Sequence, residues 1–304
     1  MRTILLAVHI ARDEATKVAA AFAADLAAHG IGVRVLDTEA DALRAAGIDD
    51  LSVVVAGPGA AADCELAVVF GGDGTILRAA EVCRGTGTPV LGVNLGHVGF
   101  LAEADVEDLQ HVVQGVVERS YTVEERLTVD VSVMVAGEVV ATNWALNEAS
   151  VEKAARERML EIVVEIDDRP VSRWGCDGIV CATPTGSTAY NFSAGGPIVW
   201  PEVSALLMVP ISAHALFARP LVVSPDSTLA IEVVGEQSTG VLWCDGRRAA
   251  DLPLGARVEV VRGRENVHLA RLHPASFADR LVRKFDLPVA GWRGAAERRR
   301  EDRD

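Results

Sequence analysis

A glycine-rich turn follows an unbroken apolar run in the first half of the sequence. Residues Leu66–Phe70 are all apolar, which is typical of a strand buried on both faces of a parallel sheet. The turn reads GGDGT (71–75), and the apolar residues after it have helical spacing. Because a turn between a strand end and a helix start presents backbone N–H groups to an anion, this pattern predicts a phosphate-binding loop.

Asp73 is the unexpected residue of this loop, because a carboxylate repels a phosphate unless it has another task. It could bind a metal ion, orient a hydroxyl or accept its proton. A plainer alternative is that Asp73 caps the helix that follows. The motif G-x-x-x-x-G-K-[ST] is excluded, because none of the three lysines, Lys17, Lys153 and Lys284, follows a glycine.

Two polar segments in the second half have residue types suited to ligand binding. Asn147 and Glu148 end a β-type run, and an adjacent amide and carboxylate can together bind a diol. Residues 183–197, TPTGSTAYNFSAGGP, carry too many hydroxyls for a core and would suit a sugar, a base or a phosphate. An ordinary turn remains the alternative for both segments, and Asp245-Gly246-Arg247 is a weak signal alone.

The composition excludes several classes of protein. The chain has 304 residues, of which 50% are hydrophobic, and a formal net charge of −14. The length suggests two domains, and the acidic charge argues against nucleic acid or an anionic membrane as a partner. Five cysteines without a C-x-x-C pair predict a reduced, cytoplasmic protein. The seven histidines have no zinc-binding spacing, and no apolar run is long enough for a bilayer.

Residues 1–121 alternate between strand and helix patterns, which predicts an α/β domain with an open, mostly parallel sheet. The expected strands are Ile4–Val8, Val33–Leu36, Leu66–Phe70 and Val90–Val93, and the expected helices are 13–28, the segment after the glycine turn and 105–118. The stretch 39–62 has no clear pattern, with a strand or a loop at Val53–Val55. A second glycine-spaced turn, NLGHVGFL (94–101), follows the last of these strands.

From Tyr121 onward the helical periodicity vanishes, which predicts an all-β, sandwich-like domain over 122–274. The β-type runs are 127–135, 138–146, 160–166, 178–182, 206–210, 228–234, 241–244 and 257–261, with turn signals at Ala136-Gly137, Asp167-Asp168 and Asp245-Gly246. Residues 276–285 are expected to form a helix that returns to the first domain, which then includes about 275–292 as well. Residues 293–304 predict a flexible tail, with a basic interaction tail as the alternative.

Taken together, these motifs resemble those of the NAD kinase family over essentially the whole chain. The matching segments are GGDGT (71–75), GVNLGHVGFLAE (92–103), ALNE (145–148), GCDGIVCATPTGSTAY (175–190), SAGGP (193–197), HALFARP (214–220) and the DG of 245–246. GGDG alone is shared with diacylglycerol-type lipid kinases, whereas the ordered set is far more specific. The resemblance implies transfer of a terminal phosphoryl group to the 2′-hydroxyl of the adenosine ribose of NAD, which gives NADP, in an active site between the domains.

The resemblance also implies roles for individual residues. Asp73 is the implied catalytic residue and accepts the proton of the ribose hydroxyl, while Gly72 and Gly74 let the pyrophosphate approach. Asn147 and Glu148 are implied at the adenosine end. The other implied NAD-binding residues are Asp177 on the nicotinamide side, Arg78, Arg158, Thr188, Ala189, Tyr190, Asn191, Phe192, Ser193 and Arg247. Position 247 is often glutamine in the family, so the arginine here is a departure.

The resemblance implies ATP, another nucleotide or inorganic polyphosphate as the phosphoryl donor, with Mg²⁺ or another divalent cation on the phosphates. It predicts no metal-ligating side chain, and it implies a homodimer or homotetramer. Some bacterial relatives carry arginine at the position of Gly175 and discriminate against NADH, so glycine predicts that this protein also acts on NADH. The alternative is that Gly175 only serves a backbone turn before Cys176.

Two other functions stay open at this point. A lipid kinase would share GGDG, but it needs membrane affinity, which the acidic charge disfavours. A non-catalytic NAD-binding sensor would be marked by the loss of Asp73, which is present.

Overall fold

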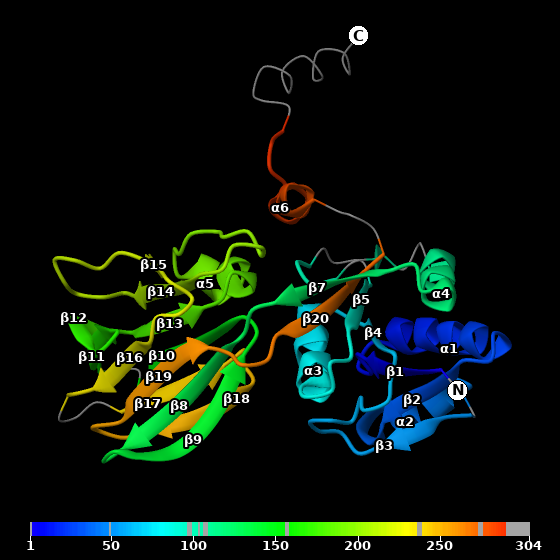
Figure 1. The fold of residues 1–304 in the computed structure, drawn as a ribbon, viewed down its shortest axis with the longest axis horizontal. Coiled ribbons are helices and arrows are strands. Elements are labelled where there is room, and N and C mark those ends of the chain that lie inside the picture. Colours follow the sequence, from blue (N-terminus) through cyan, green and yellow to red (C-terminus); the bar gives the residue numbers. More distant parts are fainter. Residues whose placement is uncertain are drawn as a thin grey trace, which may run out of the picture. The chain divides into compact units, whose positions relative to one another are not determined.

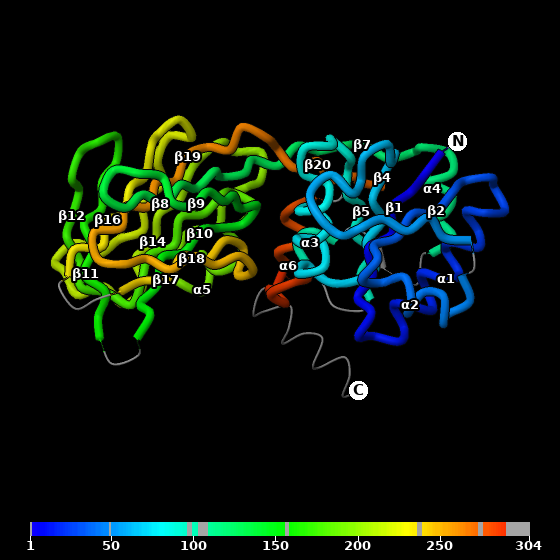
Figure 2. The backbone as a smooth tube through the Cα atoms, turned by 90° about the horizontal axis from the view of Figure 1, so that it is seen from below, coloured from blue at the N-terminus to red at the C-terminus, as the bar shows by residue number. Residues whose placement is uncertain are grey.

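The computed structural model describes residues 2–48, 50–95, 99–102, 104–105, 109–155, 158–235, 239–272 and 276–289. It divides into two compact units, one formed by Met1–Glu124 with His268–Asp304 and the other by Glu125–Val267. The chain therefore leaves the first unit once and returns to it once. Figure 2 shows the two connecting segments, in green after β7 (Thr122–Arg126) and in orange before β20 (Val267–Arg271).

The first unit is built on one eight-stranded sheet. Its other strands are β1 (Thr3–Val8), β2 (Gly32–Leu36), β3 (Ser52–Val54), β4 (Leu66–Phe70), β5 (Val90–Asn94) and β6 (Ala104–Asp105). The strand order is β3-β2-β1-β4-β5-β20-β7, with β6 beside β5, and the described pairs from β3 to β20 are parallel. This arrangement confirms the predicted open, mostly parallel sheet.

Helices cover this sheet. They are α1 (Asp13–Ala28), α2 (Asp37–Ala45), α3 (Asp73–Cys83) and α4 (Leu109–Glu118). A further helix, α6 (Phe277–Phe285), packs against Phe100. Figure 1 shows α1 and α4 side by side, and both place apolar side chains such as Phe22 and Val112 in the core cluster that contains Phe70. None of the helices described is long and apolar enough to cross a membrane.

The stretch 39–62, which has no clear pattern in the sequence, contains most of helix α2, whose Glu39 is fully buried. It also contains β3, at the position where a strand or a loop was expected. One expected boundary in the first unit was wrong. The helix expected over 105–118 is described from Leu109, because Ala104–Asp105 pairs with β5 as strand β6. Residues 106–108 of that prediction lie outside the described residues.

The second unit consists of two six-stranded antiparallel sheets. One contains, in order, β15 (Leu221–Val223), β14 (Leu206–Ile211), β13 (Gly178–Ala182), β10 (Glu148–Lys153), β17 (Gly240–Cys244) and β18 (Arg248–Leu252). The other contains β12 (Arg169–Cys176), β11 (Leu160–Ile166), β16 (Leu229–Val233), β19 (Arg257–Arg262), β8 (Val129–Val135) and β9 (Glu138–Ala145). The sequence signal missed β10, β12, β15 and β18 of this unit, and β7 and β20 of the first unit. Polar residues alternate with apolar ones in most of these strands, and all but β12 are at most six residues long.

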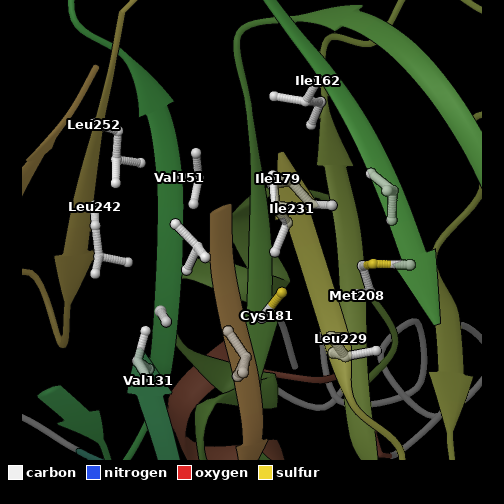
Figure 3. Packing of buried hydrophobic residues seen from close by; sticks show 14 of the residues in the cluster. Val131, Val151, Ile162, Ile179, Cys181, Met208, Leu229, Ile231, Leu242 and Leu252 are labelled. Carbon is white, nitrogen blue, oxygen red and sulfur yellow. The ribbon is translucent and has the colours of Figure 1, made fainter. Parts of the chain in front are cut away.

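One apolar core joins these two sheets. Figure 3 shows Val131, Ile162 and Ile231 from one sheet among Val151 and Ile179 from the other, and all are buried. Alternate residues of the strands face this core, as the burial of β8 illustrates. The predicted all-β, sandwich-like fold is thereby confirmed.

The C-terminal helix α6 returns to the first unit, as predicted. Ser276 caps it by accepting a hydrogen bond from the N–H of Ala278 (3.2 Å). The rings of Phe277 and Phe285 lie 6.0 and 5.8 Å from the ring of Phe100, measured between centroids. The chain rejoins the first unit before this helix, through β20, which was not among the expected strands. The tail expected over 293–304 lies outside the described residues.

Candidate functional site

The loops after β1 and β4 meet at the point where the strand order of the sheet reverses. The chain runs outward from β1 to β2 and β3 on one side, and from β4 to β5 on the other. The N–H of His9, just after β1, donates to the carbonyl of Phe70 at the end of β4 (3.0 Å). Ligands of open α/β sheets bind outside the carboxyl ends of the strands at such a point, so the fold places the GGDG loop where a nucleotide would bind.

Asp73 is the first residue of α3, and its carboxylate reaches out to a neighbouring loop. Oδ2 accepts a hydrogen bond from the N–H of Phe100 (3.1 Å), and Oδ1 accepts one from the N–H of Leu101 (3.2 Å). A Cβ at Gly99 would lie 2.3 Å from Oδ1, so this approach requires glycine there. The carboxylate is partly exposed, and each oxygen keeps a lone pair for another donor. The contacts differ from the helix-cap alternative, because the carboxylate binds this loop and not the N–H groups of its own helix.

The loop that binds Asp73 is held from its other side by two arginines. Arg280 of α6 donates to the carbonyl of Phe100 (3.3 Å), and Arg271 of β20 donates to the carbonyl of Leu101 (3.1 Å). Arg271 is only 2% exposed and also donates to Glu124 (3.0 Å). The peptide groups that face Asp73 are therefore fixed by the C-terminal part of the chain.

Gly72 and Gly74 have open space around them. Apart from their own neighbours in the chain and the helix backbone, no atom of the described residues lies within 4 Å of where a Cβ would stand at either position, and neither residue has a left-handed φ. Packing and backbone conformation therefore do not require glycine at 72 or 74, unlike at Gly99. Without side chains at these two positions, the loop backbone stays uncovered, so a ligand could approach it closely.

Arg78 lies one turn into α3 and is anchored beside the end of β1. It donates to the carbonyl of Val8 (3.0 Å) and forms an ion pair with Glu39. Glu39 is fully buried and also accepts from the N–H of Val8 (2.8 Å). Burial raises the pKa of Glu39, and the Arg78 charge opposes that rise. The partly exposed guanidinium of Arg78 is thus fixed at the carboxyl edge of the sheet.

In the second unit, Asn147 lies in the turn between β9 and β10 and Glu148 is the first residue of β10, and both are more than nine-tenths buried. The carboxylate of Asp245 accepts hydrogen bonds from the N–H groups of Leu146 (3.0 Å), Asn147 (2.7 Å) and Glu148 (3.4 Å). Arg248 donates to the same carboxylate (2.9 Å). Asp245 was expected as a turn residue and as part of a DG segment that matches the family, without a role of its own, and no signal in the sequence separates these contacts from the turn.

Thr183 and Gly186 complete the surroundings of this turn. The Thr183 hydroxyl donates to the carbonyl of Leu146 (2.6 Å), and its N–H donates to the carbonyl of Asn147 (2.9 Å). A Cβ at Gly186 would lie 1.9 Å from the Asn147 carbonyl oxygen, so only glycine lets the segment 183–188 come this close.

Glu148 has an unusual electrostatic environment. Burial, together with the charges of Asp245 and Glu152, raises its pKa to about 8, and a hydrogen bond from the N–H of Tyr190 opposes the rise. Its Oε2 atom is buried and has no hydrogen-bond partner among the residues described. At neutral pH the protonated carboxyl is favoured, and it can donate one hydrogen bond and accept another. Such a group suits a ribose hydroxyl, which also donates and accepts.

The hydroxyl-rich segment forms a 3₁₀ helix, η2 (Thr185–Thr188), and a short helix, α5 (Tyr190–Ser193). Tyr190 packs on a small apolar cluster that includes Val180 and Leu207, on the opposite face of the sheet from the main core. Burial raises the pKa of Tyr190, as do the charges of Glu152, Glu148 and Asp177. The structure therefore gathers Tyr190, Glu148 and Asp177 on one face of this sheet.

Asn191 differs from what was expected of a ligand-binding residue. It is fully buried, and its Nδ2 donates to the carbonyls of Ser187 (3.1 Å) and Pro197 (3.0 Å). Its side-chain amide thus ties the two ends of its own loop together. Around it, Thr188 and Ala189 are partly exposed, whereas Phe192 and Ser193 are exposed.

The remaining predicted residues lie at the surface of the second unit. Asp177 forms an ion pair with Lys153, whose hydrogen bond and charge lower the pKa of Asp177. Arg158 and Arg247 are exposed, the first just before β11 and the second in the turn between β17 and β18. The described residues contain no group of three or more His, Cys, Asp or Glu side chains that could hold a metal ion.

An α/β unit with a glycine-rich loop beside a positioned carboxylate, combined with a β-sandwich that carries a polar turn, defines a two-domain small-molecule kinase. Family models agree with this class: the ATP-NAD kinase N-terminal domain matches residues 4–121, and the ATP-NAD kinase C-terminal domain matches residues 146–272. The chain belongs to the NAD kinase family, and the resemblance seen in the sequence is thereby confirmed.

Relatives and solved structures agree. The chain is 62% identical to NAD kinase 2 of Streptomyces avermitilis over 295 residues, which cover 97% of each chain. It is 59% identical to the NAD kinase of Thermobifida fusca over 304 residues, which cover 98% of this chain and 93% of that one. A yeast NADH kinase in complex with NADH superposes with a TM-score of 0.82 at 25% identity, covering 96% of this chain and 88% of that one. The protein is accordingly a phosphotransferase of the NAD kinase type.

Proposed function

We propose that this protein transfers the terminal phosphoryl group of ATP to the 2′-hydroxyl of the adenosine ribose of NAD, which yields NADP. The observation that carries the proposal is the partly exposed carboxylate of Asp73, which two backbone N–H groups fix beside the open space at Gly72 and Gly74. A ribose hydroxyl is a poor nucleophile, and a positioned carboxylate can accept its proton as the new O–P bond forms. The leaving group is ADP, which takes the electrons of the broken P–O bond.

The roles of the other residues belong to the same proposal. The backbone N–H groups at the start of α3 bind phosphate oxygens, because Gly72 and Gly74 leave the loop uncovered. Asn147 and Glu148 hold the adenosine ribose, and Tyr190 lies against the base. Arg78 contributes its fixed positive charge at the sheet edge. Asn191 supports the loop from inside, and Thr188, Ala189, Phe192, Ser193, Arg158, Arg247 and Asp177 are assigned to the rim of the dinucleotide site.

The donor and the cation are assigned on chemical grounds. When bound with the donor, Mg²⁺ or another divalent cation would supply charge neutralisation to the phosphates. Asp73 keeps one lone pair on each oxygen beyond its two backbone contacts, so it could hold the ribose hydroxyl and would also be available to the cation. Other nucleotides and polyphosphate are alternative donors.

NADH is assigned as a second substrate. Gly175 lies in β12, where its φ is not left-handed and a Cβ would be in ordinary contact with Met159, 3.4 Å away. The backbone therefore does not need glycine there, which removes the main support for a purely structural role. The absence of a side chain leaves room for a reduced, puckered nicotinamide ring.

The proposal extends to the assembly and the compartment. We assign a homodimer or homotetramer in the cytoplasm, with Leu216 and Phe217 of the HALFARP segment in a subunit contact, because both are exposed large apolar side chains. Light scattering of the purified protein tests the assembly, and a monomer at micromolar concentration would contradict it.

One coupled assay tests the activity. Purified protein is incubated with NAD, Mg²⁺ and ATP or polyphosphate, and NADP is measured with an NADP-specific dehydrogenase. NADP is expected, whereas diacylglycerol offered in vesicles is expected to stay unphosphorylated. Folded protein that makes no NADP with any donor would contradict the proposal, and lipid phosphorylation would favour the lipid-kinase alternative.

A further inference from the structure

The Asp245 carboxylate makes more contacts than its hairpin turn requires. Asp245 and Gly246 have φ values of +52° and +61°, which suit a tight hairpin turn and which asparagine or glycine would also adopt. The turn closes through the N–H of Arg247 and the carbonyl of Cys244 (3.1 Å), without any side chain. The side chain of Asp245 is nevertheless 2% exposed and is fully engaged by the segment 146–148.

The backbone of Leu146–Glu148 is held from both sides. Asp245 accepts from the three N–H groups. Thr183 donates to the carbonyls of Leu146 and Asn147, and the N–H of Asp245 donates to the carbonyl of Glu148 (2.9 Å). Each peptide N–H and C=O of these three residues is thus used within the fold. Only the side chains of Asn147 and Glu148 remain to bind a ligand, and the peptide groups decide where those side chains point.

Arg248 connects this arrangement to the strand before it. Its guanidinium donates to Asp245 (2.9 Å), to the carbonyl of Trp144 (2.7 Å) and to the side chain of Asn143 (2.8 Å). It also lies over the Trp144 ring, 4.7 Å from the centroid. The buried negative charge of Asp245 is therefore compensated, and β9, β17 and β18 are joined at the point where β10 begins.

We propose that Asp245 is a positioning residue for NAD binding. Through the N–H groups of residues 146–148 it fixes the direction in which Asn147 and Glu148 meet the adenosine ribose. The inference rests on the proposed function, because it takes these two residues as NAD-binding groups. Asp245 itself does not touch the dinucleotide, because both carboxylate oxygens are enclosed by their protein donors.

The test compares two aspartates in equivalent hairpin turns. Asp167, between β11 and β12, also has a φ of +52°, and its carboxylate also accepts from a backbone N–H, that of Thr228 (2.9 Å), and from the hydroxyl of Ser227 (3.1 Å). It has no contact with the segment 146–148 among those described. Asp245→Gly and Asp167→Gly both keep a residue that tolerates left-handed φ, so both keep the turn and lose the side-chain hydrogen bonds.

Both variants are expected to melt at a lower temperature than the wild type. Asp245→Gly alone is expected to raise KM for NAD by about 10- to 100-fold, with KM for ATP unchanged and kcat reduced less, because misplaced binding groups weaken orientation. Asp245→Asn keeps an accepting oxygen and the turn, so it is expected to recover part of the NAD affinity, and it replaces the glycine variant if that one does not fold. An unchanged KM for NAD in the asparagine and glycine variants, or an equal rise in Asp167→Gly, overturns the inference.

A double-mutant cycle separates this inference from the proposed function. If Asp245 acts through Asn147, the effects of Asn147→Ala and Asp245→Gly on NAD binding are not additive, whereas those of Asn147→Ala and Asp167→Gly are. Isothermal titration with NAD measures each variant. If Asn147→Ala and Glu148→Gln leave NAD binding unchanged, the proposed NAD-binding roles fail. If they weaken binding and the cycle with Asp245→Gly is additive, only the positioning role fails.

Discussion

Asp73 and Asp245 each bind consecutive backbone N–H groups, one in the α/β unit and one in the β-sandwich. Asp73 accepts from two N–H groups, remains partly exposed and faces open space at Gly72 and Gly74. Asp245 accepts from three N–H groups and an arginine, and its side chain is 2% exposed. The same chemical device thus leaves one carboxylate accessible to a substrate and encloses the other.

The difference in exposure between the two carboxylates matches two different tasks, proton transfer for Asp73 and the shaping of a binding site for Asp245. A carboxylate that accepts a proton must reach the substrate, so its hydrogen bonds can only fix it from one side. A carboxylate that shapes a binding turn works best when every contact is internal, because any exchange with water would loosen the turn. We therefore expect changes at the first site to alter turnover and changes at the second to alter binding, specificity and stability.

Replacement of Asp73 is expected to have the largest effect. Asp73→Asn keeps the size of the side chain but cannot accept the proton, so kcat is expected to fall on the order of 10²–10⁴-fold with NAD binding mostly kept. Steady-state kinetics and NAD titration measure both quantities. Lost NAD binding together with a high residual kcat would show that Asp73 acts in binding. Asp73 and Asp245 would then not differ in the way proposed here.

A methyl group at Gly74 tests the open space beside Asp73. Gly74 is exposed and lies within α3, so Gly74→Ala is expected to keep or slightly raise stability, by about 0.5 kcal/mol. Its kcat/KM is expected to fall about tenfold or more, because the methyl group occupies space that a phosphate needs. Thermal melting and kinetics on the same preparation decide, and full activity would mean that no ligand approaches this glycine.

Gly175→Arg tests whether the second unit controls specificity without changing the chemistry. We expect kcat/KM for NADH to fall about tenfold more than that for NAD, which corresponds to ~1.4 kcal/mol of differential binding in the transition state. The fold is expected to tolerate the change, because a Cβ at Gly175 meets only the flexible end of Met159, 3.4 Å away. An unchanged ratio between the two substrates, with an unchanged melting curve, would contradict the selectivity.

Titration of Glu148 is expected to alter stability and to leave the chemical step least affected. Its pKa is raised from 4.5 to about 8 in the folded chain, so the unfolded chain releases this proton first as the pH rises. The contribution of Glu148 to stability is therefore fully present below pH 4.5 and is lost as the pH approaches 8. Glu148→Gln cannot titrate, so wild type should lose stability relative to this variant as the pH rises from 5 to 8, by roughly 1 kcal/mol per pH unit. Calorimetry of ligand-free protein measures the difference in unfolding free energy between the two proteins. A difference that does not change with pH would contradict the raised pKa of Glu148.

The sequence predicted the sheet of the first unit because its central strands are continuous apolar runs, and it predicted the sandwich of the second because β-type runs there are separated by turn signals. Leu66–Phe70 and Leu160–Ile166 begin and end at the predicted residues. The strand Glu148–Lys153 was missed because its residues on one face, Glu148, Ser150 and Glu152, are polar yet buried or partly buried. Periodicity alone cannot distinguish such a face from a solvent-exposed loop.

In the candidate site, too, the sequence could predict some residues and not others. Asp73 could be found because a carboxylate in a phosphate loop has few ordinary explanations. Asp245 could not, because Asp-Gly is common in hairpin turns and its partners lie about a hundred positions away in the sequence, between 97 and 99 residues. The internal role of Asn191 was equally hidden, because a local motif does not reveal which of its side chains point inward.

The sheet order of the first unit has a consequence for synthesis on the ribosome. Strand β20 lies between β5 and β7, although β7 is complete some 140 residues earlier, as the bounds Thr122–Arg126 and Val267–Arg271 show. The second unit is one continuous stretch, so it can fold as soon as residue 267 has emerged, while the first waits for its missing strand. Nascent chains that stop before Val267 should therefore expose the edges of β5 and β7 to chaperones. The loop that binds Asp73 is supported by Arg271 and Arg280 only after these two residues have been synthesised.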